Sequence, residues 1–179
     1  MENGPGSGDL QTISGQKCPM CQTDNLALLE HNREVPYFGR VFMFSMTCSN
    51  CKYHVVDVEA QDKGEPAKYT LDVSEVDDLN IRVIKSSTAV VRIPRITTIT
   101  PGPVSNGYIT TVEGILKRVQ KQIEDVRDNE EDPAAKKKAK SLIKKLTRVM
   151  WGKESLKIII EDINGNSAIV SEKAVKTKI

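Results

Sequence analysis

Two short cysteine motifs decide the fold of this chain: CPMC at residues 18–21 and CSNC at residues 48–51. Pro19 and Asn50 favour a tight turn inside each motif, and such a turn aims both of its thiols at one point. Two turns of this kind close a tetrahedral cage of thiolates, a ligand set that suits zinc. We therefore predict one structural Zn²⁺ ion bound by Cys18, Cys21, Cys48 and Cys51.

Other chemistry is less favoured for these cysteines. A redox motif needs a strand–helix context, whereas both pairs lie among β-type residues. Disulfides are rare in the reducing cytosol, and a catalytic zinc keeps an open position that four thiolates would fill. We expect His31 and His54 to be ordinary strand or surface residues. Residues 22–47 exceed the usual ribbon spacing of about 15–20 residues, and a long β-hairpin between the motifs would absorb the excess.

The composition describes a folded and nearly neutral chain. Its 179 residues are 39% hydrophobic and 28% charged, with a formal net charge of +2. The length fits one domain, or one domain with a small appended module. No apolar run reaches the ~18 residues of a membrane-spanning helix, so no membrane role is expected. The small net charge argues against a protein that coats nucleic acid.

The chain divides into four parts. Residues 1–16 are rich in Gly and Ser and lack the features of a signal peptide, so we expect a flexible leader and a cytoplasmic protein. Residues 17–60 form the predicted zinc-ribbon module. Residues 68–171 form a β domain with a helical hairpin at about 110–151, and residues 172–179 a short polar tail.

Short β-type runs separated by Pro, Gly, Ser or Asp predict a barrel, sandwich or jelly-roll-like body. These runs are 68–73, 79–84, 89–93 and 95–99. Further along, runs 156–163 and 167–170 flank Asn164-Gly165, a strong signal for a β-hairpin with a type I′ turn. The predicted fold class is mostly β with a helical hairpin: a four-cysteine zinc ribbon followed by a jelly-roll-like domain.

Two amphipathic helices make the predicted helical hairpin. Thr110 and Glu113 match a capping box at the start of the first helix. Asp132 as N-cap and Pro133 at the first helical position begin the second helix. We expect Asp162 and the asparagines near it to serve turn chemistry.

Two regions are candidates for contact with a partner. Five of the eight aromatic residues lie between positions 37 and 53, too many for a short hairpin to bury alone. We predict an apolar tip carrying Tyr37, Phe38 and Arg40; the alternative is that the aromatic residues pack as the core of the zinc module. The second helix is basic and offers Lys137, Lys140 and Lys144; the alternative is a solvated helix face.

The sequence lacks a recognisable catalytic set. It has no Gly-rich phosphate loop, no nucleophile elbow and no His-Glu-x-x-His helix, and its two histidines leave little scope for acid–base chemistry. We therefore expect a protein that is not an enzyme.

Beyond the cysteine motifs, three further blocks carry a resemblance: VIKSSTA at residues 83–89, GYITTVEGI at 107–115 and DINGNS at 162–167. Together with the motifs, they resemble the ZPR-type zinc-finger proteins of eukaryotes and archaea over residues 17–170. The resemblance implies a zinc ribbon joined to a double-stranded β-helix with a helical hairpin. This module occurs once here, as in archaeal members, whereas eukaryotic members carry it twice.

The resemblance also implies a partner. The family is known for binding the GTP-binding translation elongation factor 1-alpha, with a proposed role in its folding. Our first hypothesis is therefore a zinc-binding adaptor or folding helper for such a factor. The alternative is a nucleic-acid-binding zinc ribbon that uses its aromatic residues for stacking and the basic helix for phosphates; an enzyme is the third. The sequence leaves the oligomeric state open.

Overall fold

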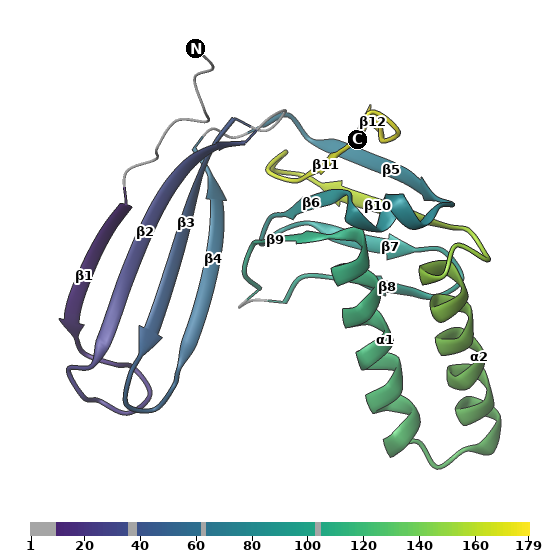
Figure 1. Ribbon diagram of the computed structural model, residues 1–179, viewed down its shortest axis with the longest axis horizontal. Helices are drawn as coiled ribbons and strands as arrows, with labels where there is room; N and C mark the ends of the chain where they lie inside the picture. The colour runs from purple at the N-terminus through teal and green to yellow at the C-terminus, as the bar shows by residue number, and fades with distance from the viewer. Residues whose placement is uncertain (1–9, 36–38, 62–63, 103–104) are drawn as a thin grey trace.

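The computed structural model describes residues 10–35, 39–61, 64–102 and 105–179. Twelve strands and two α-helices make up the described chain (Figure 1). The first four strands are β1 (Leu10–Gln16), β2 (Leu26–Val35), β3 (Gly39–Cys48) and β4 (His54–Ala60). The remaining strands are β5 (Ala67–Val73), β6 (Arg82–Lys85), β7 (Val90–Ile93), β8 (Thr97–Ile99), β9 (Tyr108–Thr111), β10 (Leu156–Asp162), β11 (Ala168–Val170) and β12 (Val175–Lys178). The helices are α1 (Val112–Asn129), α2 (Pro133–Met150) and a short 3₁₀ turn at Val76–Asn80.

The first four strands form an antiparallel sheet in sequence order, β1-β2-β3-β4. The long hairpin predicted between the cysteine motifs is the β2–β3 pair, in which Leu26 lies opposite Cys48 and Val35 opposite Gly39. Because neighbouring strands alternate in direction, the connections β1–β2 and β3–β4 lie at the same end of the sheet (Figure 1). The fold therefore brings the two cysteine motifs together.

The rest of the chain forms a jelly-roll body from two sheets, ordered β12-β5-β10-β7-β8 and β11-β6-β9. Strand β10 lies at the centre of the larger sheet, where every second side chain is buried. This alternation follows from the period of two in a strand that buries one face. Both sheets and both helices contribute to one apolar core, which includes Leu71, Val83, Ile84, Ile115, Leu116, Leu146, Ile158 and Ile160.

The two helices form the predicted hairpin between β9 and β10 (Figure 1). Asp132 caps α2 as expected, because its carboxylate accepts hydrogen bonds from the amides of Ala134 (3.0 Å) and Ala135 (3.2 Å). The capping box predicted at Thr110 is wrong by one residue. Thr110 ends up in β9, and Thr111 caps α1 by accepting a 3.2 Å hydrogen bond from Gly114. Neither helix is long and apolar enough to cross a membrane, and the same holds for every described helix.

Both chain ends of the described structure differ from the prediction. Residues 1–9 lie outside the described residues, but residues 10–16 are strand β1, not a flexible leader. The tail expected at 172–179 contains strand β12, which pairs with β5. Lys173 also donates a 2.7 Å hydrogen bond to Asp78, whose side chain is only 2% exposed. Every residue of β1 and β12 is exposed, so neither segment has the alternation of buried and exposed positions that marks a strand, and the partner of β12 lies about 100 residues earlier in the chain.

The hairpin predicted at Asn164-Gly165 is also wrong. Strand β10 pairs with β5 and β7, whereas β11 pairs with β6 in the other sheet. A type I′ turn needs a positive φ at both central residues, and of these two only Gly165 has one, at 67°. The segment therefore carries the chain from one sheet of the jelly roll to the other.

The two halves of the structure meet where β4 approaches β9. The amide of Gly107 donates a 2.8 Å hydrogen bond to the carboxylate of Asp57, and the side chain of Asn106 donates to the Val56 carbonyl at 3.2 Å. A Cβ atom on Gly107 would collide with the carbonyl oxygen of Val58. Close backbone approach at this glycine therefore joins the ribbon sheet to the jelly roll.

Candidate metal centre

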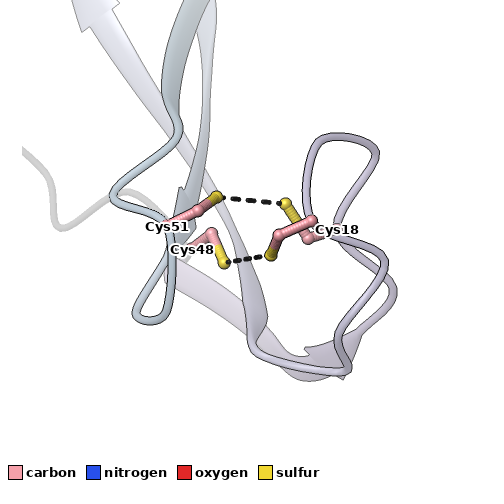
Figure 2. A group of neighbouring side chains, drawn as sticks. Cys18, Cys48 and Cys51 are labelled. Atoms are coloured by element: carbon pink, nitrogen blue, oxygen red, sulfur yellow. Dashed lines mark hydrogen bonds between the residues drawn. The ribbon is translucent and has the colours of Figure 1, made fainter.

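The four cysteines lie in two loops at one end of the ribbon sheet. Cys18 and Cys21 belong to the β1–β2 connection. Cys48 is the last residue of β3, and Cys51 belongs to the β3–β4 connection that follows it. Figure 2 shows the thiols of Cys18 and Cys51 facing one another across the space between the loops. Antiparallel pairing of β2 with β3 thus aligns two motifs that are far apart in the sequence.

The two loops have the same backbone geometry. In the first, the amide of Cys18 donates to Thr23 (2.8 Å) and that of Gln22 donates to Cys18 (2.9 Å). In the second, Cys48 donates to Tyr53 (2.8 Å) and Lys52 to Cys48 (3.1 Å), at the same sequence offsets.

Each loop also holds the residue after its second cysteine in the left-handed region. The φ angles are 60° for Gln22 and 61° for Lys52. Non-glycine residues rarely adopt this conformation. Its occurrence at the matching position of both loops indicates that each loop is shaped to present two thiols.

The separations of the sulfur atoms match a tetrahedral zinc site. The Sγ atoms of Cys18 and Cys51 are 3.7 Å apart, and those of Cys21 and Cys48 are 3.6 Å apart. All four sulfurs lie within 4.8 Å of one another. A tetrahedron with Zn–S bonds of about 2.3 Å requires sulfurs about 3.8 Å apart. The donor set therefore fits Zn²⁺ in type, number and spacing, and all four cysteines are free thiols.

Burial differs among the four thiols. Cys18 and Cys48 are fully buried, Cys21 is half-buried and Cys51 is exposed. Leu26 is buried beside them, and partly buried Leu28, Met46 and Tyr53 pack against this small cluster. The apolar surroundings limit the access of water to the thiols from the sheet side.

The surroundings of Cys21 and Cys51 shift the pKa values of these two thiols in opposite directions. Hydrogen bonds from the side chain and backbone of Thr23 lower the pKa of Cys21 to about 5. A backbone hydrogen bond at Tyr53 favours the Cys51 thiolate, but desolvation and the three neighbouring cysteines outweigh it and raise the pKa of Cys51 to about 12. Four negatively charged thiolates repel one another at these distances, and a bound divalent cation would offset that repulsion.

The two histidines lie outside this group. His54 shares a 2.9 Å hydrogen bond with Thr47 on the sheet surface, and His31 lies in β2 opposite Met43. Among the described residues, the four cysteines are the one group of metal-binding side chains close enough to share an ion. Mixed cysteine–histidine ligation therefore has no geometric support.

The comparisons with known proteins identify the family. A family model described as the ZPR1 jelly-roll domain matches residues 77–178. The chain belongs to the ZPR1 family. It is 34% identical over 165 residues to an uncharacterized ZPR1-like protein of Methanocaldococcus jannaschii. The aligned residues make up 91% of this chain and 83% of that protein. The ZPR1 membership agrees with the resemblance carried by the five sequence blocks.

Eukaryotic ZPR1 proteins match as well. The zinc finger chaperone zpr1 of Schizosaccharomyces pombe is 32% identical over 139 residues, covering 75% of this chain and 30% of that protein. The zinc finger protein ZPR1 of Homo sapiens is 28% identical over 159 residues, covering 85% of this chain and 34% of that protein. The chain thus spans about a third of the length of these eukaryotic proteins. Together, the four-thiol geometry and the zinc-finger relatives identify one structural Zn²⁺ at this site.

The predicted partner-contact residues do not gather at the metal centre. Tyr37 and Phe38 lie outside the described residues. Arg40 is exposed in β3, opposite Glu34. Exposed lysines on one face of α2 form the second candidate surface: Lys137, Lys140 and Lys144. Their role in binding stays a prediction.

One buried polar cluster has no counterpart among the predicted site residues. The turn chemistry expected at Asp162 is present, because its carboxylate accepts a 3.0 Å hydrogen bond from the amide of Asn164, but the residue is also fully buried. It accepts hydrogen bonds from the hydroxyls of Ser86 (2.7 Å), Thr88 (3.0 Å) and Ser167 (2.6 Å). The available signal was the position of Asp162 at the end of a strand that buries alternate residues, where the sequence pattern places it on the buried face.

Proposed function

We propose that this chain is a zinc-binding adaptor or folding helper for a GTP-binding translation factor of the elongation factor 1-alpha type. It would act in the cytoplasm through protein–protein contacts and would catalyse no reaction. The observation that carries the proposal is the match to the S. pombe protein named a zinc finger chaperone, which covers 75% of this chain. The choice of elongation factor 1-alpha rests on the family resemblance of the sequence.

The ribbon sheet supports a binding role because one of its faces is apolar and open. A hollow of about 350 Å³ lies over β1, β2 and β3 and is lined by Ile13, Leu28, Phe44 and Met46. Register places Ile13 opposite Leu28, and Leu28 opposite Met46, so these side chains lie in one row across the sheet. The side chain of Ile13 is 54% exposed. Leu28, Phe44 and Met46 are partly exposed, and a contiguous apolar surface that stays accessible to solvent is typical of protein-interaction sites.

The rim of the hollow is polar. Gln11, Glu30 and Asp57 also line the hollow, and the register places them with Phe44 in the row beside the apolar row. Binding sites for proteins commonly combine an apolar centre with a polar rim, because the rim excludes water and sets the orientation of the partner. The sheet face therefore has the composition expected for a docking surface.

Purified components test the proposal. Isothermal titration of the zinc-loaded chain with purified elongation factor 1-alpha should show a one-to-one complex. Ile13→Ser should weaken this complex about tenfold, since it removes an apolar contact from the centre of the hollow. Val175→Ser is the matched control, because Val175 is also an exposed strand residue, at 59%, but lies on β12. Absence of a complex in the presence of GTP, in the presence of GDP and without nucleotide would contradict the proposal.

Nucleic-acid binding is the second candidate, and the basic face of α2 favours it. Lys137, Lys140 and Lys144 are exposed on successive turns of this helix. Fluorescence anisotropy with a single-stranded RNA, at several salt concentrations, separates the two functions. Binding that weakens with salt and is lost in the triple variant K137Q/K140Q/K144Q would favour the RNA function. The same variant should still bind the elongation factor if the ribbon sheet is the main contact.

A further inference from the structure

A small basic hollow in the jelly roll is unrelated to the metal centre. Its volume is about 180 Å³, and it lies between the ends of β6, β8 and β9 and the first half of α1. Six polar residues line it: Lys85, Thr100, Ser105, Tyr108, Arg118 and Gln122. Acidic side chains are absent from its lining among the described residues. The hollow therefore has a positive charge and several hydrogen-bond donors.

Lys85 is the buried cation of this hollow. Its side chain is only 2% exposed, which is rare for lysine. The ammonium group can donate three hydrogen bonds, and it donates one, of 2.9 Å, to the carbonyl oxygen of Ser86. Its Nζ atom lies 5.5 Å from the centre of the Tyr108 ring. The group thus has donor capacity left over at the wall of a cavity.

The nearest buried carboxylate does not use that capacity. Asp162 already accepts hydrogen bonds from three hydroxyl groups and from the amide of Asn164 (3.0 Å). Within the described part of the chain, Lys85 has no carboxylate oxygen closer than the 4.0 Å of an ion pair. Burial lowers the pKa of Lys85, and the negative charge of Asp162 only partly opposes this effect. An anion in the hollow would supply the ammonium group of Lys85 with a counter-charge and with further hydrogen-bond acceptors.

Arg118 supplies a second cation on the same aromatic ring. Its guanidinium carbon lies 4.2 Å from the centre of the Tyr108 ring, a stacking distance. This contact places the guanidinium over the ring, and among the described residues its N–H groups have no hydrogen-bond partner, so its edge can donate two parallel hydrogen bonds, the geometry that oxyanions prefer. Gln122 follows one turn later on α1, beside the same hollow. Lysine and arginine thus converge from a strand and a helix.

We propose that this hollow binds a phosphate group, either as the free ion or as part of a small phosphomonoester, between Lys85 and Arg118. Its size supports a group of this kind, because pockets for drug-sized molecules have volumes of roughly 300–1,000 Å³. The hydroxyls of Thr100 and Ser105 and the amide of Gln122 line the same space and can donate to the remaining oxygens. This proposal does not depend on the identity of the protein partner.

A calorimetric titration of the full zinc-loaded chain with inorganic phosphate, at constant ionic strength, tests the site. Saturable binding of one phosphate per chain is expected. Arg118→Gln should weaken it about tenfold or more, since a charge-assisted hydrogen-bond pair is lost. Lys117→Gln is the matched control: it removes one positive charge from the neighbouring residue of α1, whose side chain is 64% exposed and pairs with Glu113.

A second probe distinguishes the sources of the phosphate. Glycerol phosphate that binds more tightly than inorganic phosphate, with the same dependence on Arg118, assigns the site to a phosphomonoester; the reverse order assigns it to the free ion. Lys85→Met provides a further variant, to be used after its circular dichroism spectrum matches that of the wild type. Absence of saturable binding of both probes, or equal affinity in wild type and Arg118→Gln, would overturn the proposal.

Discussion

The carboxylate of Asp162 accepts a 2.7 Å hydrogen bond from the hydroxyl of Ser86, which lies 76 positions earlier in the chain. Ser167 joins the pair from the other side: its hydroxyl donates to Asp162 at 2.6 Å and accepts a 2.9 Å hydrogen bond from the Ser86 amide. These contacts fasten the end of β10 to the turn after β6. Two of the blocks that carry the family resemblance therefore meet at one buried carboxylate.

Replacement of Asp162 should destabilise the jelly roll. Asp162→Asn keeps the size of the side chain but removes its charge, so the hydrogen bonds from three hydroxyls weaken inside the protein. We expect the free energy of unfolding to fall by about 2–3 kcal/mol, as measured by urea denaturation. Asp77→Asn is the control, because Asp77 is exposed in the short 3₁₀ turn, and it should change little. Equal effects of the two substitutions would show that the cluster is not stabilising.

The stability of the protein at acid pH should depend on the same cluster around Asp162. Burial alone would raise the pKa of Asp162, but the hydrogen bonds from Ser167, Ser86 and Thr88 outweigh it and lower the pKa. A carboxyl group whose pKa is lower in the folded state than in the unfolded state stabilises the fold at pH values above its unfolded-state pKa. This contribution is lost as the pH falls below about 4. Urea midpoints between pH 7 and pH 3 should therefore fall less steeply for Asp162→Asn than for the wild type; parallel curves would contradict this.

Lys173 should stabilise the C-terminal segment through a buried partner. Its ammonium group contacts Asp78, which is 2% exposed, and also Glu75. Lys173→Ala leaves the Asp78 charge buried without its cation, and a buried charge without a partner is destabilising. We expect a clear drop in the urea midpoint. Lys178→Ala is the control, because Lys178 pairs with Glu65 where both side chains are exposed; it should have almost no effect. A drop of the same size in both variants would contradict the assignment.

Loss of one cysteine should release the zinc. In Cys18→Ser, the metal content should fall from one zinc per chain to none, because three thiolates no longer close the site. The amide signals of β1–β4 should lose dispersion in a nuclear magnetic resonance spectrum, since zinc binding and folding of such modules are coupled. Met20→Ser lies between Cys18 and Cys21, is 69% exposed and should keep its zinc. Retention of zinc in Cys18→Ser would contradict the four-thiol site.

A glycine substitution should loosen the joint between the two halves. Gly107→Ala places a methyl group against the carbonyl oxygen of Val58, so β4 and β9 have to separate. Hydrogen exchange should accelerate at Val58 and Gly107, whereas the cores of both halves should keep their protection. Gly102→Ala is the matched control, because a Cβ atom there meets nothing within 4 Å. Unchanged exchange in Gly107→Ala would show that the halves are not held together at this point.

Features that depend on local sequence could be predicted. Metal-binding turns need two cysteines at a fixed short spacing, so residues 18–21 and 48–51 identify them directly. The start of α2 was also predictable, since the Asp132 cap and Pro133 act within one helical turn. The resemblance extended these predictions to the jelly-roll fold, which the family match at residues 77–178 confirms.

Features that depend on distant partners could not be predicted. Asn164-Gly165 has the local chemistry of a hairpin, yet β11 pairs with β6, about 80 residues away, because both strands bury side chains in the same core. Strand β1 exposes all of its residues, so its sequence carries no alternation of buried and exposed positions. The hollow beside Lys85 brings together β6, β9 and α1, and only the fold places its two cations on one tyrosine ring.

The folding of elongation factor 1-alpha itself tests the central claim most directly. The factor can be synthesised in a cell-free translation system, with and without the purified zinc-loaded chain, and its protease-resistant, GTP-binding fraction measured. The proposed function predicts that the chain raises this fraction, that Met20→Ser does so equally well, and that Cys18→Ser does not. The same yield of folded factor in the presence and absence of the chain would contradict a role as a folding helper.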